Sequence, residues 1–464
     1  MVIFNTATRE KQKLVPIKKD QVSIYVCGPT VYNLIHLGNA RALCVFDTLR
    51  RYLEYKGYKV KYVQNFTDVD DKIIKKANEE GKAPSDVSEN AIKEYFIDAR
   101  GLNVRDADIH PKVTENMDNI LAVIDELVKK GFAYEADGDV YFDTTKYPDY
   151  GKLSHMPLED LQAGARIEIG DKKHNPMDFA VWKAAKEGEP YWDSPYGKGR
   201  PGWHIECSAM SKHYIGDTID IHGGGSDLIF PHHENEIAQS HCATGKTLAN
   251  IWMHNGMLNI DNKKMSKSKN NFFLVRQVAE IYGYEAIRFL LLQVHYRSQL
   301  NYTAEVMDSC KAAVQRLYNC KENLERRLKN ADISAPASEE VCKMLEFKVQ
   351  EFNACLDDDF NTADAISIVF ELVREANIYC ADEASSPSDI KAIYDVFLKL
   401  NSVLGFLYEK KEEKIPSQVN ELVEQRALAR KNKDFKLADE IRDKIFELGF
   451  TVKETRQGTI IEKI

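Results

Sequence analysis

The stretch from Ser23 to Asn39, SIYVCGPTVYNLIHLGN, decides how the first half of the chain folds. It predicts a buried strand over Ser23–Cys27, a turn at Gly28-Pro29 and a helix that opens near Gly38-Asn39. The apolar residues that follow recur three or four apart, the period of a helix with one buried face. Lys59–Asn65 alternates and is rich in β-branched and aromatic residues, so it predicts the next strand. The result is a βαβ unit whose helix N-terminus is placed to receive an anion.

Length and composition indicate a protein of ordinary globular type. The 464 residues suggest about three domains, and 44% hydrophobic with 29% charged residues is typical of such proteins. We expect no membrane span and no signal peptide, because no run of 18 apolar residues exists and the start, MVIFNTATREKQK, is polar. The nine scattered cysteines favour reduced thiols in a cytoplasmic compartment. A net charge of −9 leans against RNA binding except at local basic patches.

The composition and hydrophobic pattern of the chain change several times after the βαβ unit. The sequence predicts a helix over Val113–Lys130 and a strand pair near 132–143, followed by a stretch rich in Gly, Pro and Asp that reaches Gly199. This change of composition predicts an insertion between two halves of one α/β fold. The second half contains a strand over Ile219–His222 and a helix that starts at Pro231. Residues from about 275 to 410 predict amphipathic helices, and the tail predicts two short basic helices and a hairpin.

Two short motifs far apart in the chain suggest a nucleotide site. His36-Leu37-Gly38-Asn39 opens the first helix, and Lys264-Met265-Ser266-Lys267-Ser268 lies in a lysine-rich loop. Each alone fits an ordinary turn or a solvated loop. Together, in this order, they resemble the paired HIGH and KMSKS motifs of class I aminoacyl-tRNA synthetases.

That resemblance implies how ATP is used. A carboxylate that attacks an α-phosphorus needs no general base, so catalysis rests on positioning and on stabilising phosphoryl charge. The resemblance implies catalytic roles for His36, Asn39, Lys264 and Lys267, with Lys267 also binding the nucleotide. Gly38 permits close approach of the nucleotide to the backbone. Asn39 stands where the family usually has a second histidine, so it can cap the helix and donate a hydrogen bond without carrying charge.

A glycine-rich turn follows the strand at 219–222. In the resembled family the corresponding loop touches ribose or adenine, which implies nucleotide contacts for Gly224, Gly225 and Asp227. A tight turn in which Asp227 caps a helix explains the same residues equally well.

A set of metal-ligand residue types is spread over the two halves. Cys27 follows the first strand, Cys207 follows the insertion, and His232 and Glu236 are four apart and share a helix face. Two sulfurs, an imidazole and a carboxylate form a competent zinc set. Spacing alone does not pair them: buried cysteines are usually small hydrophobes, and His233 competes with His232.

A more specific resemblance extends over essentially the whole chain. The segments GPTVYNLIHLGN, FTDVDDKI, DFAVWK, GWHIECSAM and HGGGSDLIFPHHENEIAQS match the cysteinyl-tRNA synthetase family. The resemblance implies that Cys27, Cys207, His232 and Glu236 bind one zinc ion. It also places Thr67 and Trp203 against the substrate amino acid, where strand-end and core packing is the alternative.

A metal beside the amino acid suits the recognition of cysteine. Serine differs from cysteine by oxygen for sulfur at nearly the same size, and an apolar pocket separates such near-isosteres by only roughly 10². Zinc binds a thiolate directly, and a thiol loses its proton near the cation far more readily than an alcohol. The hypothesis is that zinc selects the substrate without an editing domain, and normal selectivity in Cys27→Ser would contradict it.

The C-terminal third implies an RNA partner through the same resemblance. Residues 357–365, DDDFNTADA, open a helical bundle like the anticodon-binding domain of the family, and RALARKNKDFKLADEIRDKIFELGF resembles its small tail module. Positive charge gathers in this tail at Arg426, Arg430, Lys431, Lys433, Lys436, Arg442 and Lys444. Such a patch suits phosphates, although a solvated helix face is the alternative. Ile461 stands where many relatives have an aromatic residue.

The predicted fold class is therefore α/β, a class I synthetase with a Rossmann-like catalytic domain that carries an insertion. We expect the following parts: 1–110 and 201–260 as the two catalytic halves, 111–200 as the insertion, 261–310 as the KMSKS loop and stem-contact region, 311–412 as the anticodon-binding bundle and 413–464 as the C-terminal module.

The predicted reaction is ATP-dependent activation of L-cysteine and its transfer to the 3′ end of tRNA-Cys. Mg²⁺ is expected with ATP, and a monomer is expected from the family. A ligase that acylates an amino sugar in mycothiol synthesis is one alternative, but it lacks a full anticodon-binding tail. A noncatalytic RNA-binding paralogue is another, and the intact His36, Lys267 and metal ligands argue against it.

Overall fold

The computed structural model describes residues 1–155, 172–260, 263–264, 273–408, 416–432, 434–448, 450–455 and 458–463. Lys267 lies outside the described residues, and only the backbone of Lys264 is described, in a short strand. The chain forms two compact units, Met1–Leu407 and Tyr408–Ile464. Among the described helices none combines the length and apolar character needed to cross a membrane.

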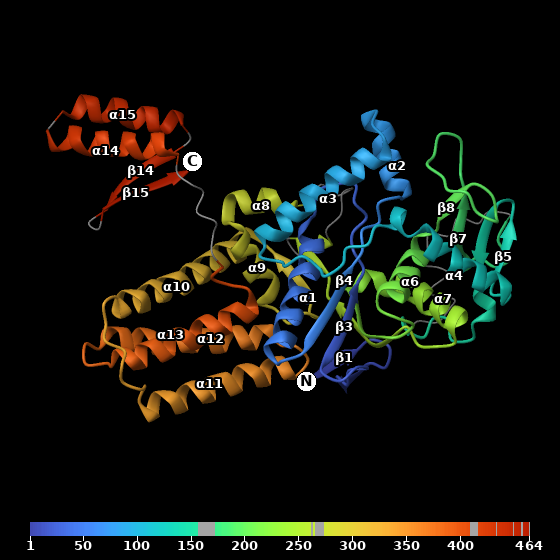
Figure 1. Cartoon of the computed structure of the whole chain (residues 1–464), viewed down its shortest axis with the longest axis horizontal. Helices are drawn as coiled ribbons and strands as arrows, with labels where there is room; N and C mark the ends of the chain where they lie inside the picture. The colour runs from blue at the N-terminus through green and yellow to red at the C-terminus, as the bar shows by residue number, and fades with distance from the viewer. Residues whose placement is uncertain are drawn as a thin grey trace. The chain divides into compact units, whose positions relative to one another are not determined.

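A parallel four-stranded sheet in the order β10-β9-β3-β4 forms the centre of the first unit (Figure 1). Its strands are β3 (Gln21–Val26), β4 (Lys59–Gln64), β9 (Ile219–Gly225) and β10 (Ala249–Asn255). Helix α1 (Leu37–Tyr55) connects β3 to β4, so the predicted βαβ unit forms with boundaries within two residues of those expected. All four strands end at one edge of the sheet, the place where α/β folds bind ligands.

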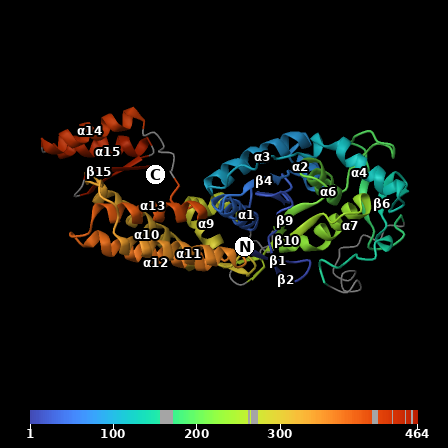
Figure 2. The same cartoon turned by 60° about the horizontal axis from the view of Figure 1, so that its bottom comes forward.

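Alternate residues of the strands enter two separate cores. Ile24, Ile221 and Met253 join the core around α1. Tyr25 and Trp252 join a second core with three helices, α4 (Met117–Lys129), α6 (Trp203–Tyr214) and α7 (Glu234–Thr244). Figure 2 shows α1 on one side of β9 and β10, and α6 and α7 on the other. Both faces of the sheet are thus covered, as is usual for parallel strands.

Helix α1 is buried on more than the one face that its apolar period predicted. Arg41, Asp47 and Thr48 are all buried on it, in addition to its apolar residues. The reason is tertiary packing, because α1 packs not only against the sheet but also against α9 (Tyr284–Leu292) and α13 (Pro387–Leu404). Its buried polar side chains are paired: Asp47, for example, lies 2.7 Å from Arg288 of α9 and 2.8 Å from Arg51.

The described residues of the segment expected as the insertion include helix α4 and an antiparallel sheet, β5-β6-β7-β8. A short 3₁₀ turn, Val113–Glu115, precedes α4 (Met117–Lys129), and the predicted strand pair forms as β5 (Ala133–Ala136) and β6 (Asp139–Phe142). Two further strands, β7 (Phe179–Ala184) and β8 (Gly199–Pro201), lie where the sequence predicted only a Gly/Pro/Asp-rich stretch. A three-residue strand that contains glycine and proline carries no alternating pattern, so β8 was missed.

The segment expected as the second catalytic half contains α6 (Trp203–Tyr214) and α7 (Glu234–Thr244) around β9. Phe230 is extended, and the helical turn that runs into α7 follows it from Pro231, inside a π-helical segment Ile229–His233. Other elements of the unit are β1 (Val2–Asn5), β2 (Glu10–Lys13), α2 (Asp71–Glu80), α3 (Pro84–Gly101), β11 (Leu258–Ile260), β12 (Lys263–Lys264), α8 (Val275–Tyr282), α9 (Tyr284–Leu292) and β13 (Leu300–Tyr302).

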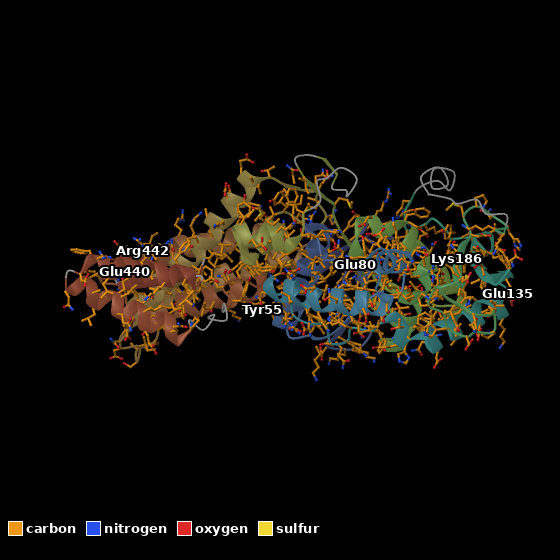
Figure 3. All side chains as sticks on the ribbon, turned by 90° about the horizontal axis from the view of Figure 1, so that it is seen from above. Tyr55, Glu80, Glu135, Lys186, Glu440 and Arg442 are labelled. Atoms are coloured by element: carbon orange, nitrogen blue, oxygen red, sulfur yellow. The ribbon has the colours of Figure 1, made fainter. Side chains whose placement is uncertain are left out.

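Four long helices complete this unit: α10 (Ala304–Leu328), α11 (Glu339–Asp357), α12 (Thr362–Ala381) and α13 (Pro387–Leu404). Their core is continuous with that of the catalytic part. The Tyr55 side chain, labelled in Figure 3, lies at the end of α1 with the Lys399 ammonium of α13 5.0 Å from its ring centroid. The boundaries expected at 110, 200, 260 and 310 fall inside one compact unit and stay predictions.

The second unit consists of α14 (Ser417–Lys431), α15 (Phe435–Glu447) and the hairpin β14 (Phe450–Thr455) and β15 (Gly458–Lys463). Val419, Ile441 and Ile445 form its small core. The basic patch expected here is smaller than the sequence suggests, because Arg426 is buried and Arg442 pairs with acidic neighbours on its own helix.

Candidate active site and metal centre

A cavity of about 440 Å³ opens at the carboxyl edge of the central sheet. Residues from both catalytic halves line it. They include Cys27, Gly28, His36, Gly38, Asn39, Gln64, Lys72, Trp203, Gly225, Asp227 and Asn255–Leu258. The nucleotide motif of the first helix and one predicted metal ligand therefore face the same space.

The start of α1 is fixed by a reciprocal pair of hydrogen bonds. His36 is the N-cap, and its Nδ1 accepts the backbone N–H of Asn39 at 3.2 Å. In return the Asn39 side-chain oxygen accepts the backbone N–H of His36 at 3.2 Å. The sequence indicated that Asn39 can cap the helix; the N-cap residue is His36, because the helix begins at Leu37, and the Asn39 side chain completes the cap from the third helical position. The pair leaves the first turn of α1 rigid beside the cavity.

The turn after β3 is pressed against the end of β4. The backbone N–H of Gly28 donates to the Asn65 side-chain oxygen at 2.9 Å. A Cβ atom on Gly28 would lie 1.6 Å from the backbone oxygen of Asn65, so only glycine fits here. This close approach sets the position of Cys27, which directly precedes the turn.

The glycine-rich segment forms a turn but does not have the Asp227 helix cap that the alternative interpretation required. Gly224 lies in β9 against His233, and Gly225 is the residue before a 3₁₀ turn, Ser226–Leu228. Asp227 is exposed, and the described structure has no side-chain cap at this turn. Gly225 and Asp227 line the cavity, and their contact with the nucleotide stays a prediction.

The four predicted zinc ligands come together. Their donor atoms all lie within 4.8 Å of one another. The Cys27 sulfur is 3.6 Å from the Cys207 sulfur and 3.3 Å from Glu236 Oε1, and His232 Nε2 is 2.9 Å from the same oxygen. Cys27 comes from the end of β3, Cys207 from α6, and His232 and Glu236 from consecutive turns before and in α7.

The electrostatics of this cluster favour the deprotonated forms of two donors, Glu236 and Cys207, whereas burial raises the pKa of Cys27 and, against burial, the Glu236 charge raises that of His232. Burial would raise the pKa of Glu236, but the His222 and His232 charges outweigh it and hold that pKa well below its usual range. Burial would also raise the pKa of Cys207, yet hydrogen bonds with Cys27 and His232 lower it to about 6. A thiolate and a carboxylate at the same place are what a divalent cation requires.

The donor set passes a geometric test for zinc. Tetrahedral zinc with bonds of about 2.3 Å to sulfur places two thiolates about 3.8 Å apart. The Cys27 and Cys207 sulfurs are 3.6 Å apart, so little movement is needed to bind the ion. The residues present therefore fit zinc.

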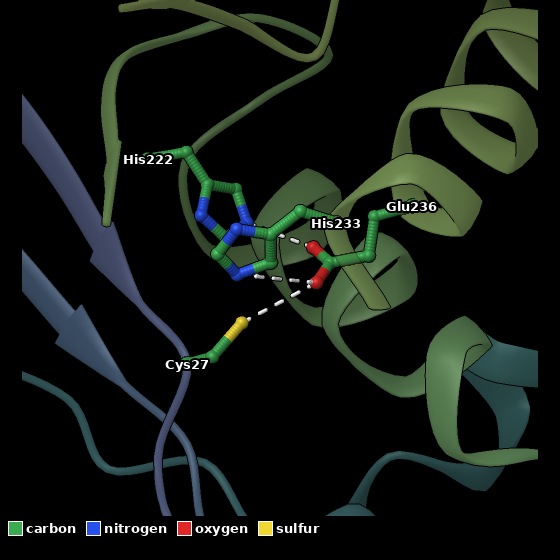
Figure 4. A group of neighbouring side chains, drawn as sticks. All are labelled: Cys27, His222, His233 and Glu236. Carbon is green, nitrogen blue, oxygen red and sulfur yellow. Dashed lines mark hydrogen bonds and ion pairs between the residues drawn. The ribbon is translucent and has the colours of Figure 1, made fainter. Parts of the chain in front are cut away.

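A second combination of four residues also has metal-ligand spacing. Cys27 and Glu236 are shared, and His222 and His233 replace Cys207 and His232 (Figure 4). Figure 4 shows both imidazoles facing the Glu236 carboxylate, with His222 Nε2 2.7 Å from Glu236 Oε2. Both His232 and His233 are buried at the cluster, which is why sequence alone did not choose between them. The set that contains His232 also contains two cysteine sulfurs, which zinc prefers as thiolate ligands.

Several residues at this site were missed by sequence reasoning. His222 fixes Glu236, and His204 Nδ1 lies 2.9 Å from His232 Nδ1, on the ring side opposite the cluster. Burial holds the pKa of His204 well below its usual range, so this ring is neutral. His204 was quoted only as part of a motif, and a histidine in a strand or helix gives no pattern of its own.

The two residues expected beside the amino acid occupy different surroundings. Trp203 lines the cavity, is 39% exposed and stacks on His232 with ring centroids 4.2 Å apart. Thr67 is buried, and its hydroxyl donates to Glu206 Oε2 at 2.7 Å. Burial raises the pKa of Glu206 well above its usual range. Trp203 is thus directly accessible from the cavity, while Thr67 is tied to a buried carboxyl group.

Family models account for most of the chain. Residues 13–312 match the class I (C) tRNA synthetase catalytic domain, residues 351–408 match the DALR domain, and residues 412–460 match the cysteinyl-tRNA ligase anticodon binding domain. The matches follow the predicted order of a catalytic part, a helical part and a small C-terminal module.

Curated relatives are similar over their entire length. The cysteine–tRNA ligase of Clostridioides difficile (strain 630) is 53% identical over 467 residues, with both chains fully covered. The cysteine–tRNA ligase of Caldicellulosiruptor saccharolyticus is 52% identical over 466 residues, again with full coverage of both.

Solved structures support the fold. A methionyl-tRNA synthetase of Mycobacterium tuberculosis in complex with methionyl-adenylate superposes with a TM-score of 0.62 at 13% identity, covering 83% of this chain and 90% of that one. A LeuRS of Agrobacterium radiobacter K84 in a ternary complex with tRNA superposes with a TM-score of 0.61 at 12% identity, covering 84% of each chain. The class I fold predicted from the sequence is confirmed, and the chain belongs to the cysteine–tRNA ligase family of class I aminoacyl-tRNA synthetases.

Proposed function

We propose that this member of the family activates L-cysteine with ATP and transfers it to the 3′ end of tRNA-Cys, and that a bound zinc ion selects the substrate. The observation that carries the proposal is the position of the metal cluster. Cys27, one of its four donors, lines the same cavity as His36 and Gly38 of the nucleotide motif. A thiol-recognising group and a nucleotide site thus share one space of about 440 Å³.

The chain's own residues supply orientation for the activation step. The bonds between His36 and Asn39 hold the N-terminus of α1 beside the cavity, where the positive end of the helix dipole favours phosphoryl oxygens. Gly38 leaves room for the nucleotide at that end, and Gly225 at the end of β9 and Asp227 in the 3₁₀ turn that follows line the same cavity. We propose that Lys264 and Lys267 approach from the lysine-rich loop, and that Mg²⁺ accompanies ATP. Positioned charge of this kind is what a displacement at phosphorus needs.

Selection of cysteine follows from the donor set, one member of which, Cys27, lines the cavity. Cys27, Cys207, His232 and Glu236 would hold the ion. When bound, zinc supplies a soft cation that prefers a thiolate to an alcohol. Trp203 stacks on His232 and would close the amino-acid side of the pocket. Thr67 is proposed to contact the amino acid, oriented by Glu206.

The acceptor in this proposal is tRNA. Residues 412–460 match a cysteinyl anticodon-binding model, which separates this chain from a ligase that acylates a small amine. The predicted parts, from the insertion at 111–200 to the module at 413–464, retain their proposed roles in this arrangement. We further propose that the protein is cytoplasmic and monomeric, as expected for the family.

The test is a pair of assays on the purified full chain. Cysteine-dependent exchange of pyrophosphate into ATP measures activation, and charging of a tRNA-Cys transcript measures transfer. The proposal predicts both activities. Activation without charging would contradict tRNA as the acceptor, and the absence of exchange would contradict the catalytic role of the cavity.

A further inference from the structure

Lys72 lies in the wall of the active-site cavity, at the second residue of α2. The same wall includes Thr30, Tyr32 and Gln64. The Lys72 ammonium is 5.9 Å from the centroid of the Tyr32 ring, which keeps it at the cavity edge. Among the described residues that line this cavity, Lys72 is the only lysine or arginine.

The acidic residues next to Lys72 are engaged elsewhere. Asp70 caps α2 and accepts the backbone N–H of Lys72 at 2.9 Å. Asp71 binds the Lys183 ammonium at 3.0 Å and also pairs with Arg200, so its charge is neutralised by β7 and β8 of the insertion. Figure 1 shows α2 close to β8. These bonds anchor the first turn of α2.

Lys72 itself forms no salt bridge with any residue that the structure describes. An ammonium at the edge of a substrate cavity, without a carboxylate partner, is available to an anion that enters. The other groups around the nucleotide motif do not replace it: His36 Nδ1 is used in the helix cap, and Asn39 is neutral.

We infer that Lys72 binds an anionic oxygen of the reacting substrates, either on the α-phosphate of the nucleotide or on the carboxylate of cysteine. The inference rests on the proposed function, because both groups meet in this cavity only if the amino acid is activated here. A fixed positive charge at this point offsets the negative charge that gathers on oxygen as the carboxylate approaches the phosphorus. Lys72 therefore binds substrate in addition to the lysines of the 264–267 loop.

The chain offers a matched control for the test. Lys75 is on the same helix, its side chain is 78% exposed, it lies 3.8 Å from Glu79 and it does not line the cavity. We expect Lys72→Met to lower kcat/KM for cysteine-dependent pyrophosphate exchange by about 10- to 100-fold, the range for a lost hydrogen bond to a charged group. Lys72→Arg retains most of the activity, and Lys75→Met leaves it unchanged. Equal melting temperatures of the two methionine variants show that folding is intact.

The kinetic constants distinguish the sources of the anion. A higher KM for ATP in Lys72→Met identifies the nucleotide phosphate, and a higher KM for cysteine identifies the carboxylate; either result supports the inference. Exchange kinetics in Lys72→Met equal to those of Lys75→Met would overturn it. A defect confined to the KM for tRNA would also overturn it, because the partner would then be nucleic acid. If the unmodified protein lacked exchange, the proposed function would fail and this inference with it.

Discussion

Replacing Cys207 by serine tests the metal cluster while it leaves the nucleotide motif intact. Cys207 is 2% exposed on α6, and its sulfur lies 3.6 Å from that of Cys27. Serine keeps nearly the same shape but replaces a thiolate by an alcohol, which is a poor zinc ligand. Three donors remain of four. Loss of an outer partner of a ligand costs about 10- to 100-fold in metal affinity, so loss of the ligand itself should cost at least about 100-fold.

The consequence for selectivity has a definite size. Without zinc the amino-acid end of the cavity discriminates by shape alone, through contacts such as that of Trp203. A pocket of that kind separates near-isosteres by roughly 10². We therefore expect the ratio of kcat/KM for cysteine over serine to fall toward roughly 10² in Cys207→Ser, with zinc content well below one ion per chain.

Metal analysis and pyrophosphate exchange with each amino acid measure both effects. Cys242→Ser is the matched control, because Cys242 is also buried, lies on α7 near Glu236, and takes no part in the cluster. Burial raises the pKa of Cys242 to about 12, so its thiol is neutral. Full zinc content and unchanged discrimination in Cys207→Ser would refute the reasoning, as would an equal loss in Cys242→Ser.

Three further predictions concern the parts that position the site. Gly28→Ala places a Cβ atom 1.6 Å from the backbone oxygen of Asn65. We expect the free energy of unfolding in urea to fall by about 1–3 kcal/mol or more, and pyrophosphate exchange activity to fall with it. Unchanged stability would contradict the tight turn. Asp47→Asn leaves the buried Arg288 guanidinium without its anion, so the free energy of unfolding at pH 7 should drop by about 3–5 kcal/mol. Burial would raise the pKa of Asp47, but the charges of Arg288 and Arg51 outweigh it and lower that pKa. The carboxylate therefore stabilises the fold above its ordinary pKa, and the stabilisation is lost as the pH falls through the lowered value. The difference in the free energy of unfolding between the unmodified protein and Asp47→Asn should therefore shrink in acid. A difference that is independent of pH would contradict this. Deleting residues 408–464 removes one compact unit; we expect exchange within about two-fold of the full chain and kcat/KM for tRNA at least about 10-fold lower, while equal losses in both assays would contradict separate roles.

Local sequence pattern was sufficient where an element is long and flanked by clear signals. The Gly-Pro turn and the alternation in 59–65 predicted β3, α1 and β4 with small boundary errors. Pattern failed for β8, which has three residues and a proline, and for the buried polar side of α1, which depends on helices far along the chain. In both cases the missing information is tertiary packing.

The metal site shows the same division. The residue types suggested zinc, but spacing did not pair Cys27 with Cys207, 180 positions apart, and the family resemblance was needed to do so. The sequence did not indicate a role for His222 at the cluster, because a histidine in a strand has no pattern that distinguishes it from other strand residues. Its contact with Glu236 exists only after β9 and α7 have packed together.

The central claim is that one cavity joins cysteine to tRNA and uses zinc to reject serine. The most direct measurement is charging of total tRNA by the zinc-loaded protein with labelled cysteine, with labelled serine in parallel. We predict ATP-dependent label on tRNA from cysteine, and none above background from serine. Comparable charging with both amino acids would contradict selection by the metal cluster, and no charging with either would contradict the assignment of the cavity.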